Sequence, residues 1–413
     1  MTPATRALAA FAVILAGLAG RAGVDKILAL RGGPDMVALW AQLQSVVDLV
    51  CGVALAGIGS GLTVLVAQAH ADALRLLRCS IRPALCTSLA AALLTLAAAP
   101  MLAGRFAGGE MSADLVALAA AVGCAAVLPG LLCAYWLGRH RQDLILLLTL
   151  LGIVPLIAVA LFSAIGAFPG NALMVQGGVA LAVTLVLIDW RRGAARPAAD
   201  VQATDHARRQ LFHYLPVGIA IGLLSPASVI VARGLLADSL TLRDAGFVQA
   251  LWRSSEWVTG GAAGVLSLLF LARLSAAWGS GDFLRELARS GLAVLLPAAV
   301  LLLAIYANQR IVLATLYDAQ FVVSDRAAAL FLLGDWLRIA SWVFLFALYA
   351  MRRTLLIIVG EVFSLPLYAL LLHLYSASMT LELAGLLYFL SYLSYLVFNA
   401  AAVLHVPRPA IAH

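Results

Sequence analysis

Long apolar stretches separated by short polar turns cover almost the whole chain. Twelve of them can be drawn, at residues 7–30, 36–67, 83–103, 115–137, 144–167, 172–189, 211–233, 245–271, 288–308, 327–350, 354–375 and 381–404. Each is long enough to cross a bilayer as a helix, which takes about 20 residues. Gly, Pro or Asn marks the turns between them, as in Arg31–Pro34 and Phe168–Asn171. The pattern predicts an all-α, polytopic membrane protein with about 12 transmembrane helices.

The composition leads to the same class. The 413 residues are 64% hydrophobic and 11% charged, whereas soluble domains are closer to half apolar and one quarter charged. The 5 cysteines lie in the first half of the chain and form no CxxC or Cys/His spacing. We therefore expect free, packed thiols, with no metal site and no cofactor. The first apolar stretch is interpreted as an uncleaved first span.

Arginine and lysine are distributed unevenly between alternate loops. One set of loops and termini holds most of them, including Arg6, Arg75, Arg139, Arg191 and Arg285, whereas the other set holds few. Because basic residues favour the cytoplasmic side, both termini are predicted to be cytoplasmic. The net charge of +7 then reflects topology, and no nucleic-acid partner is expected.

The longest polar connection, residues 191–210, lies at the midpoint of the chain and is rich in Ala, Arg and Asp. A faint internal repeat supports a division there, because Asp48, Gly52 and Ala56 match Glu256, Gly260 and Gly264 at a constant offset. We predict an N-terminal six-helix bundle over 1–190, a cytoplasmic linker over 191–210 and a C-terminal six-helix bundle over 211–413. Transporters built this way hold substrate between their halves.

The stretch from Ala245 to Ser275 is apolar enough to span a membrane but carries polar groups on one helical face. These are Gln249, Trp252, Arg253 and Glu256, spaced three or four residues apart. The same face continues as Gly260 and Gly264, a small-residue stripe that lets a helix or a ligand approach closely. A charge inside hydrocarbon costs a few to more than ten kcal/mol. The face is therefore predicted to look into protein or a wet cavity.

Charged residues occur inside only five of the predicted spans. Outside the stretch just described they are Arg21, Asp25, Lys26, Asp48, Asp335, Arg338 and Glu361. This restriction predicts that a few helices line a polar path and that the others face lipid or one another.

Each of these residues also has a structural interpretation. Three pairs can neutralise themselves on one helix: Arg21 with Asp25, Arg253 with Glu256, and Asp335 with Arg338. Lys26 can extend to the headgroups, and Asp48 can be held by Gln44 and nearby hydroxyls. Glu361 has no cation within one turn, so its structural interpretation is a protonated, hydrogen-bonded acid.

Four stretches carry a family pattern. They are KILALRGGP at 26–34; QLQS at 42–45 with GIGSG at 57–61; the Ala245–Ser275 stretch; and LGDWLR at 333–338 with Tyr349 and Glu361 downstream. Together they resemble the Wzx-type polysaccharide flippases of the MOP superfamily, the lipid III flippases especially, over most of the chain. The chain departs from the pattern at Asp25, Ser60 and Ala272.

The resemblance implies two six-helix bundles that rock between inward- and outward-open states in the bacterial inner membrane. Its substrate would be an undecaprenyl-diphosphate-linked oligosaccharide, moved from the cytoplasmic to the periplasmic leaflet for common antigen, O-antigen or exopolysaccharide assembly. A polysaccharide polymerase and chain-length proteins would be its partners. With Arg21 added from the charge pattern, the implied cavity residues are Lys26, Gln42, Gln44, Asp48, Gln249, Trp252, Arg253, Glu256, Asp335 and Arg338. Asp25, Asp48 and Glu361 are the candidates for proton or ion coupling.

The chemistry of these residues suits such a substrate. Arg253 can bind a phosphate with two parallel hydrogen bonds, Trp252 can cover a sugar face, and glutamines can bond hydroxyls. The main alternative is a cation-coupled multidrug (MATE-like) exporter, which would use one isolated acid and an apolar cavity. A membrane enzyme such as an O-antigen polymerase or ligase usually has a large periplasmic loop with Arg and His. The predicted outer loops are short and nearly without His, so we do not expect an enzyme.

Overall fold

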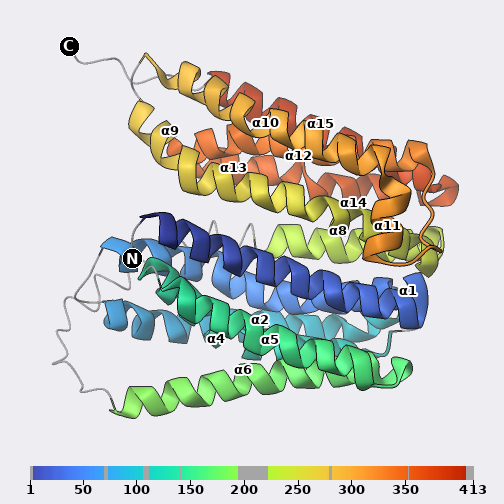
Figure 1. Ribbon diagram of the computed structural model, residues 1–413, viewed down its shortest axis with the longest axis horizontal. Coiled ribbons are helices and arrows are strands. Elements are labelled where there is room, and N and C mark those ends of the chain that lie inside the picture. Colours follow the sequence, from blue (N-terminus) through green and yellow to red (C-terminus); the bar gives the residue numbers. More distant parts are fainter. Residues whose placement is uncertain are drawn as a thin grey trace. The chain divides into compact units, whose positions relative to one another are not determined.

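The structure is a computed structural model that describes residues 3–68, 73–105, 111–139, 141–193, 222–278, 281–351 and 353–405, in which every regular element is a helix. The helices are α1 Pro3–Gln68, α2 Ala73–Arg105, α3 Ala113–Ala125, α4 Val127–Gly138, α5 Gln142–Phe162, α6 Phe168–Gly193, α8 Leu242–Val265, α9 Leu271–Ala277, α10 Phe283–Ala307, α11 Gln309–Leu316, α12 Asp325–Ala350, α13 Thr354–Val362, α14 Leu365–Leu374 and α15 Leu381–His405 (Figure 1). A further helix covers 222–239.

Within the described residues, all twelve apolar stretches are mainly helical, and short turns interrupt three of them, at Ala126, at Ser163 and Ala164, and at Phe363 and Ser364. Among the described residues, nine helices are long and apolar enough to cross a membrane, and one of these, Leu15–Leu55 within α1, overlaps the first two predicted spans. The all-α, polytopic fold class is confirmed. The predicted linker at 191–210 lies mostly outside the described residues, so the boundary at that loop stays a prediction.

Three predicted boundaries are wrong in detail. Arg31–Pro34 is a bend inside α1 and not a loop: only Gly33 leaves helical geometry, with φ 69 and ψ −167. Glycine reaches this backbone region without a Cβ clash. Phe168–Asn171 forms the first turn of α6, where a proline removes no helical hydrogen bond. The helix predicted to end at residue 233 continues to 239, because the apolar sequence Leu235–Ala237 extends it.

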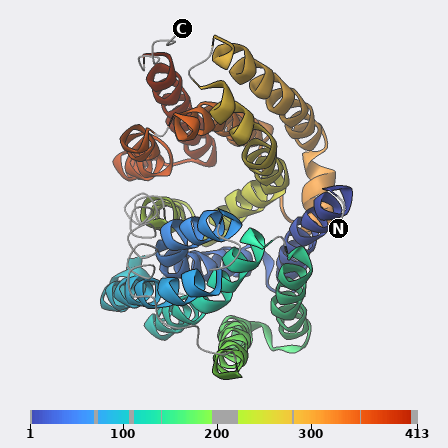
Figure 2. The same cartoon turned by 90° about the vertical axis from the view of Figure 1, so that its left-hand side faces the viewer.

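The contacts divide the chain into two compact units. The N-terminal unit comprises Met1–Gly32 and Leu39–Ile230, and the C-terminal unit comprises Gly33–Ala38 and Val231–His413. The helices of both units are seen in two views (Figures 1 and 2). The short segment after the bend of α1 therefore packs with the C-terminal helices.

Close glycine contacts bring α3 and α4 against α1 in the N-terminal unit. A Cβ on Gly123 would lie 2.8 Å from the Val47 carbonyl oxygen, and one on Gly138 would lie 2.8 Å from the Thr63 carbonyl oxygen. Arg31 caps the C-terminal end of α5: its Nη1 donates hydrogen bonds to the Ala160 and Leu161 carbonyls, at 2.5 and 3.0 Å. A guanidinium suits this position because the last carbonyls of a helix lack helical partners.

In the C-terminal unit, α12 packs against α15, α10 and α8. Gly334 permits the close approach of α15, because its Cβ would lie 2.4 Å from the Tyr388 ring. Between α8 and α9, residues Leu266–Phe270 form a π-helical turn. Before this turn, a buried face of α8 packs against α12, and Ser255 of that face donates a hydrogen bond to Asp335 of α12.

The Gly246→Ala variant is expected to lower the thermal unfolding midpoint of the detergent-solubilised protein. A Cβ at Gly246 would lie 2.3 Å from the Pro34 carbonyl oxygen, and forcing such an atom into packed structure costs about 1–3 kcal/mol. The matched control in the same helix is Gly261→Ala, where nothing lies within 4 Å. That change should leave the midpoint equal or higher, because Ala favours a helix over Gly by roughly 0.5–1 kcal/mol. Equal midpoints for the two variants would contradict the close packing of Gly246.

Candidate functional site

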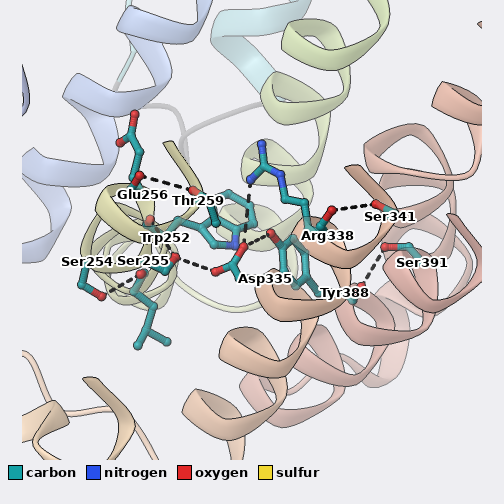
Figure 3. A network of polar contacts seen from close by, with 11 residues as sticks. Trp252, Ser254, Ser255, Glu256, Thr259, Asp335, Arg338, Ser341, Tyr388 and Ser391 are labelled. Atoms are coloured by element: carbon teal, nitrogen blue, oxygen red, sulfur yellow. Dashed lines mark hydrogen bonds and ion pairs between the residues drawn. The ribbon is translucent and has the colours of Figure 1, made fainter. Parts of the chain in front are cut away.

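The most buried acid of the predicted site, Asp335 on α12, is held by hydroxyl groups from two other helices. Its side chain is 2% exposed. Ser255 of α8 donates to Oδ2 at 2.5 Å, and Tyr388 of α15 donates to Oδ1 at 2.7 Å (Figure 3). Arg338 Nη1 lies 4.0 Å from Oδ1, one helical turn away. We call Ser255, Asp335, Arg338 and Tyr388 the aspartate network; it joins α8, α12 and α15.

Arg338 is the member of the aspartate network with an accessible charge. Its side chain is 31% exposed. The guanidinium carbon lies 4.8 Å from the Trp342 ring centroid and 5.7 Å from that of Tyr392. Stacking on two rings fixes the plane of the guanidinium, whose five N–H donors exceed what one carboxylate can accept.

Trp252 lies beside the network and is surrounded by aromatic rings. Its ring centroid is 5.7 Å from that of Tyr388 and 6.3 Å from those of both Phe331 and Tyr368. Arg233, from the helix over 222–239, also lies over the ring of Trp252, and its guanidinium carbon is 5.7 Å from the ring centroid. The ring is therefore fixed by protein contacts.

The remaining predicted residues of α8 follow the expected helical face. Arg253 Nη1 and Glu256 Oε2 are 2.5 Å apart, with side chains 19% and 33% exposed, so the predicted pair on one helix forms. Gln249 is 3% exposed. At the glycine stripe that follows, no atom of the described residues lies within 4 Å of a Cβ built on Gly260 or Gly264, so no close approach of another helix is seen there.

A second acid of the C-terminal unit, Glu361, occupies a separate hydroxyl site. It accepts a hydrogen bond from Tyr395 of α15 at 2.7 Å and one from Ser364 at 3.4 Å. The sequence offers no cation within one turn of this acid, and the two side chains that donate to it in the structure are neutral hydroxyls.

The N-terminal unit holds the other predicted residues. Gln42 donates to the Ile230 carbonyl at 3.0 Å, and Gln44 exchanges hydrogen bonds with Gln176 of α6 at 3.1 and 3.4 Å. Asp25 is 4% exposed. The side chains that are partly or fully accessible are those of Arg21, Lys26, Gln44 and Asp48.

Several polar residues that complete these contacts were missed by the sequence analysis. They are Gln176, Arg233, Ser255, Tyr388 and Tyr395. Four are neutral, and Arg233 is the last residue of the apolar stretch 211–233, where a charge carries no signal of a site. The spacing of Tyr388, Tyr392 and Tyr395 on one face of α15 was the available signal. Within the described residues, no group of three or more His, Cys, Asp or Glu is placed to hold a metal ion.

Two curated proteins resemble the chain over most of its length. They are the lipid III flippases of Escherichia coli (strain K12) and of Shigella flexneri, each 26% identical over 361 residues, which are 85% of this chain and 86% of the relative. No family model matches the sequence. The predicted resemblance to lipid III flippases is confirmed.

Solved structures of MOP-superfamily transporters share the fold. The lipid II flippase MurJ in an inward closed conformation aligns with a TM-score of 0.68 at 11% identity, covering 98% of this chain and 88% of MurJ. A MATE transporter in complex with MaD3S gives a TM-score of 0.60 at 12% identity, covering 96% and 93%. A MOP-superfamily transporter from Pyrococcus furiosus gives 0.59 at 12%, covering 95% and 94%. The chain is a multi-pass membrane protein with the fold of these transporters.

Proposed function

We propose that this protein is a flippase for an undecaprenyl-diphosphate-linked oligosaccharide of the lipid III or O-antigen type. It moves the headgroup from the cytoplasmic to the periplasmic leaflet of the inner membrane by alternating access, with both termini in the cytoplasm. The observation that carries the proposal is the alignment with two lipid III flippases over 85% of the chain.

The charge pattern supports this substrate class. A glycan and two phosphates cannot cross hydrocarbon unaided, so the pathway needs cations and hydrogen-bonding groups within the membrane. Arg253 and Arg338 are partly exposed and each is held in place, one by Glu256 and the other by aromatic rings. Arginine binds phosphate with a planar fork of donors, even while it keeps an acidic partner.

The remaining predicted roles belong to the same proposal. Arg21, Lys26, Gln42, Gln44 and Asp48 of the N-terminal unit contribute to the headgroup site, together with Gln249, Trp252, Glu256 and Asp335. Asp25, Asp48 and Glu361 are the acids through which an ion gradient would drive the cycle. A polysaccharide polymerase and chain-length proteins would receive the product.

The test is deletion and re-expression of the gene in the source bacterium. Loss should make the lipid-linked repeat unit accumulate and remove the surface polysaccharide, and re-expression should reverse both. Normal polysaccharide in the deletion strain would refute the proposal. A deletion that instead raises sensitivity to organic cations, with normal polysaccharide, would identify a multidrug exporter.

A further inference from the structure

Within the C-terminal unit, Arg233 is placed to act on a ligand although no sequence pattern singles it out. We propose that Arg233 is a binding residue for the substrate's diphosphate, held in orientation by the ring of Trp252. This inference rests on the proposed function and adds a residue and a subsite to it.

The position of Arg233 in the chain calls for an explanation. It lies inside the helix over 222–239, six residues before the helix ends, with apolar residues on both sides. Arginine is uncommon within apolar helices of membrane proteins, because its charge is costly in hydrocarbon unless it faces protein or water. Its side chain is partly buried, with the guanidinium carbon 5.7 Å from the Trp252 centroid.

Trp252 forms a rigid platform for this guanidinium. Phe331, Tyr368 and Tyr388 surround the indole with centroids 5.7–6.3 Å away, and Figure 3 shows the ring next to the aspartate network. Stacking on a fixed ring orients the guanidinium plane, so that little entropy is lost when its N–H groups bind an acceptor. Because guanidinium has five donors, it can serve a protein acceptor and a phosphate together.

The same unit holds a second arginine in the same way, since Arg338 lies over Trp342 and Tyr392. A guanidinium stacked on aromatic rings is an arrangement that matches planar, two-point binding of a phosphate. A diphosphate offers two such groups.

Two unsatisfied polar atoms next to this platform suit the sugar that follows the diphosphate. The Gln249 Oε1 acceptor and the Trp252 Nε1 donor are buried, and neither has a hydrogen-bond partner among the described residues. They lie one helical turn apart on α8. Leaving such atoms unpaired costs about 1–3 kcal/mol each. A sugar hydroxyl both donates and accepts, so its chemistry matches this acceptor and this donor.

A purely structural role for Arg233 would require only that its stem packs on Trp252 and ties two helices together. Methionine keeps much of that apolar contact and also interacts favourably with aromatic rings, but it has no charge. Lysine keeps the charge but cannot bind a phosphate with two parallel hydrogen bonds. The pair of variants therefore separates packing from phosphate binding.

The experiment measures the affinity of the purified full-length protein for farnesyl-diphosphate-linked N-acetylglucosamine by calorimetry. Arg233→Met is expected to raise Kd roughly 10-fold or more, as for the loss of a charge-assisted hydrogen bond. Arg233→Lys should raise it about 3-fold to 10-fold, and added salt should weaken the wild type more than Arg233→Met. The matched control is Arg310→Met, at an exposed arginine of α11, which should leave Kd unchanged.

Each result decides the question. If Arg233→Met is folded, as judged by its unfolding midpoint, and binds with the Kd of the wild type, the proposal is overturned. Arg233 then has only a packing role. If that variant does not fold, an unchanged Kd for Arg233→Lys would overturn it equally. Failure of the wild type itself to bind, together with normal polysaccharide in the deletion strain, would instead remove the proposed function.

Discussion

Arg253→Ala is expected to reduce export of the repeat unit at least roughly 10-fold while the protein still reaches the membrane. Removing a charge-assisted hydrogen bond to a phosphate costs about 1.5–3 kcal/mol, and each 1.4 kcal/mol is a factor of ten. The side chain is only 19% exposed, so its loss also leaves the carboxylate of Glu256, 2.5 Å away, without this partner. Export is measured as surface polysaccharide and as accumulated lipid-linked repeat unit in the deletion strain, with membrane abundance determined on the same cells.

A double variant distinguishes substrate binding from simple neutralisation of the pair. If Arg253 serves only to compensate Glu256, then Arg253→Ala combined with Glu256→Gln should restore export, because no uncompensated carboxylate remains. If Arg253 binds the diphosphate, the double variant should remain defective, and Arg253→Lys should retain part of the activity. Full export by Arg253→Ala would contradict the assigned role.

Asp335→Asn is expected to cause the second large loss, in stability as well as export. Both carboxylate oxygens accept hydroxyl hydrogen bonds, from Ser255 and Tyr388, at 2.5 and 2.7 Å. The amide nitrogen of the variant would face a hydroxyl that donates to the carboxylate in the wild type, so this hydrogen bond is lost. The substitution also removes the negative charge beside Arg338. Loss of a buried hydrogen bond to a charged group costs about 1.5–3 kcal/mol. The measurements are the unfolding midpoint in detergent and the polysaccharide produced.

The aspartate network supplies its own control. Tyr388→Phe alone should lower the unfolding midpoint. In the Asp335→Asn background it should lower the midpoint little further, because residues in one network are coupled by about 0.5–3 kcal/mol. Additive effects of the two substitutions would contradict the shared network. A normal polysaccharide ladder with a lowered midpoint would assign Asp335 a structural role alone.

The helices were predictable because apolar sequence in a bilayer has few alternatives: each backbone polar group must be bonded within the segment. The boundaries of the helices were less predictable, because each depends on the local sequence around it. A charge marks the end of the apolar stretch at Arg233, but the helix continues to residue 239. Glycine and proline were used to mark loops, but Gly33 bends α1 without ending it and Pro169 lies in the first turn of α6.

The candidate site was predictable only within single helices. Spacing placed Arg253 beside Glu256 and Arg338 beside Asp335, and both contacts form, the second at 4.0 Å. Contacts between helices depend on packing, which a single sequence does not reveal. Tyr388, Tyr395 and Ser255 have ordinary side chains for an apolar span, and only the close approach of α15 at Gly334 brings Tyr388 to Asp335.

The π-helical turn Leu266–Phe270 has a consequence for how this chain should be aligned and engineered. Such a turn accommodates one residue more than the α-helix it interrupts. Each residue of an α-helix advances the direction of its side chain by about 100°. Deleting one residue there would therefore rotate everything after it by that angle, turning Arg273 to a different side without disturbing Arg253. Homologues with a regular helix at this position should show a one-residue gap within these five positions, with the polar residues aligned on both sides.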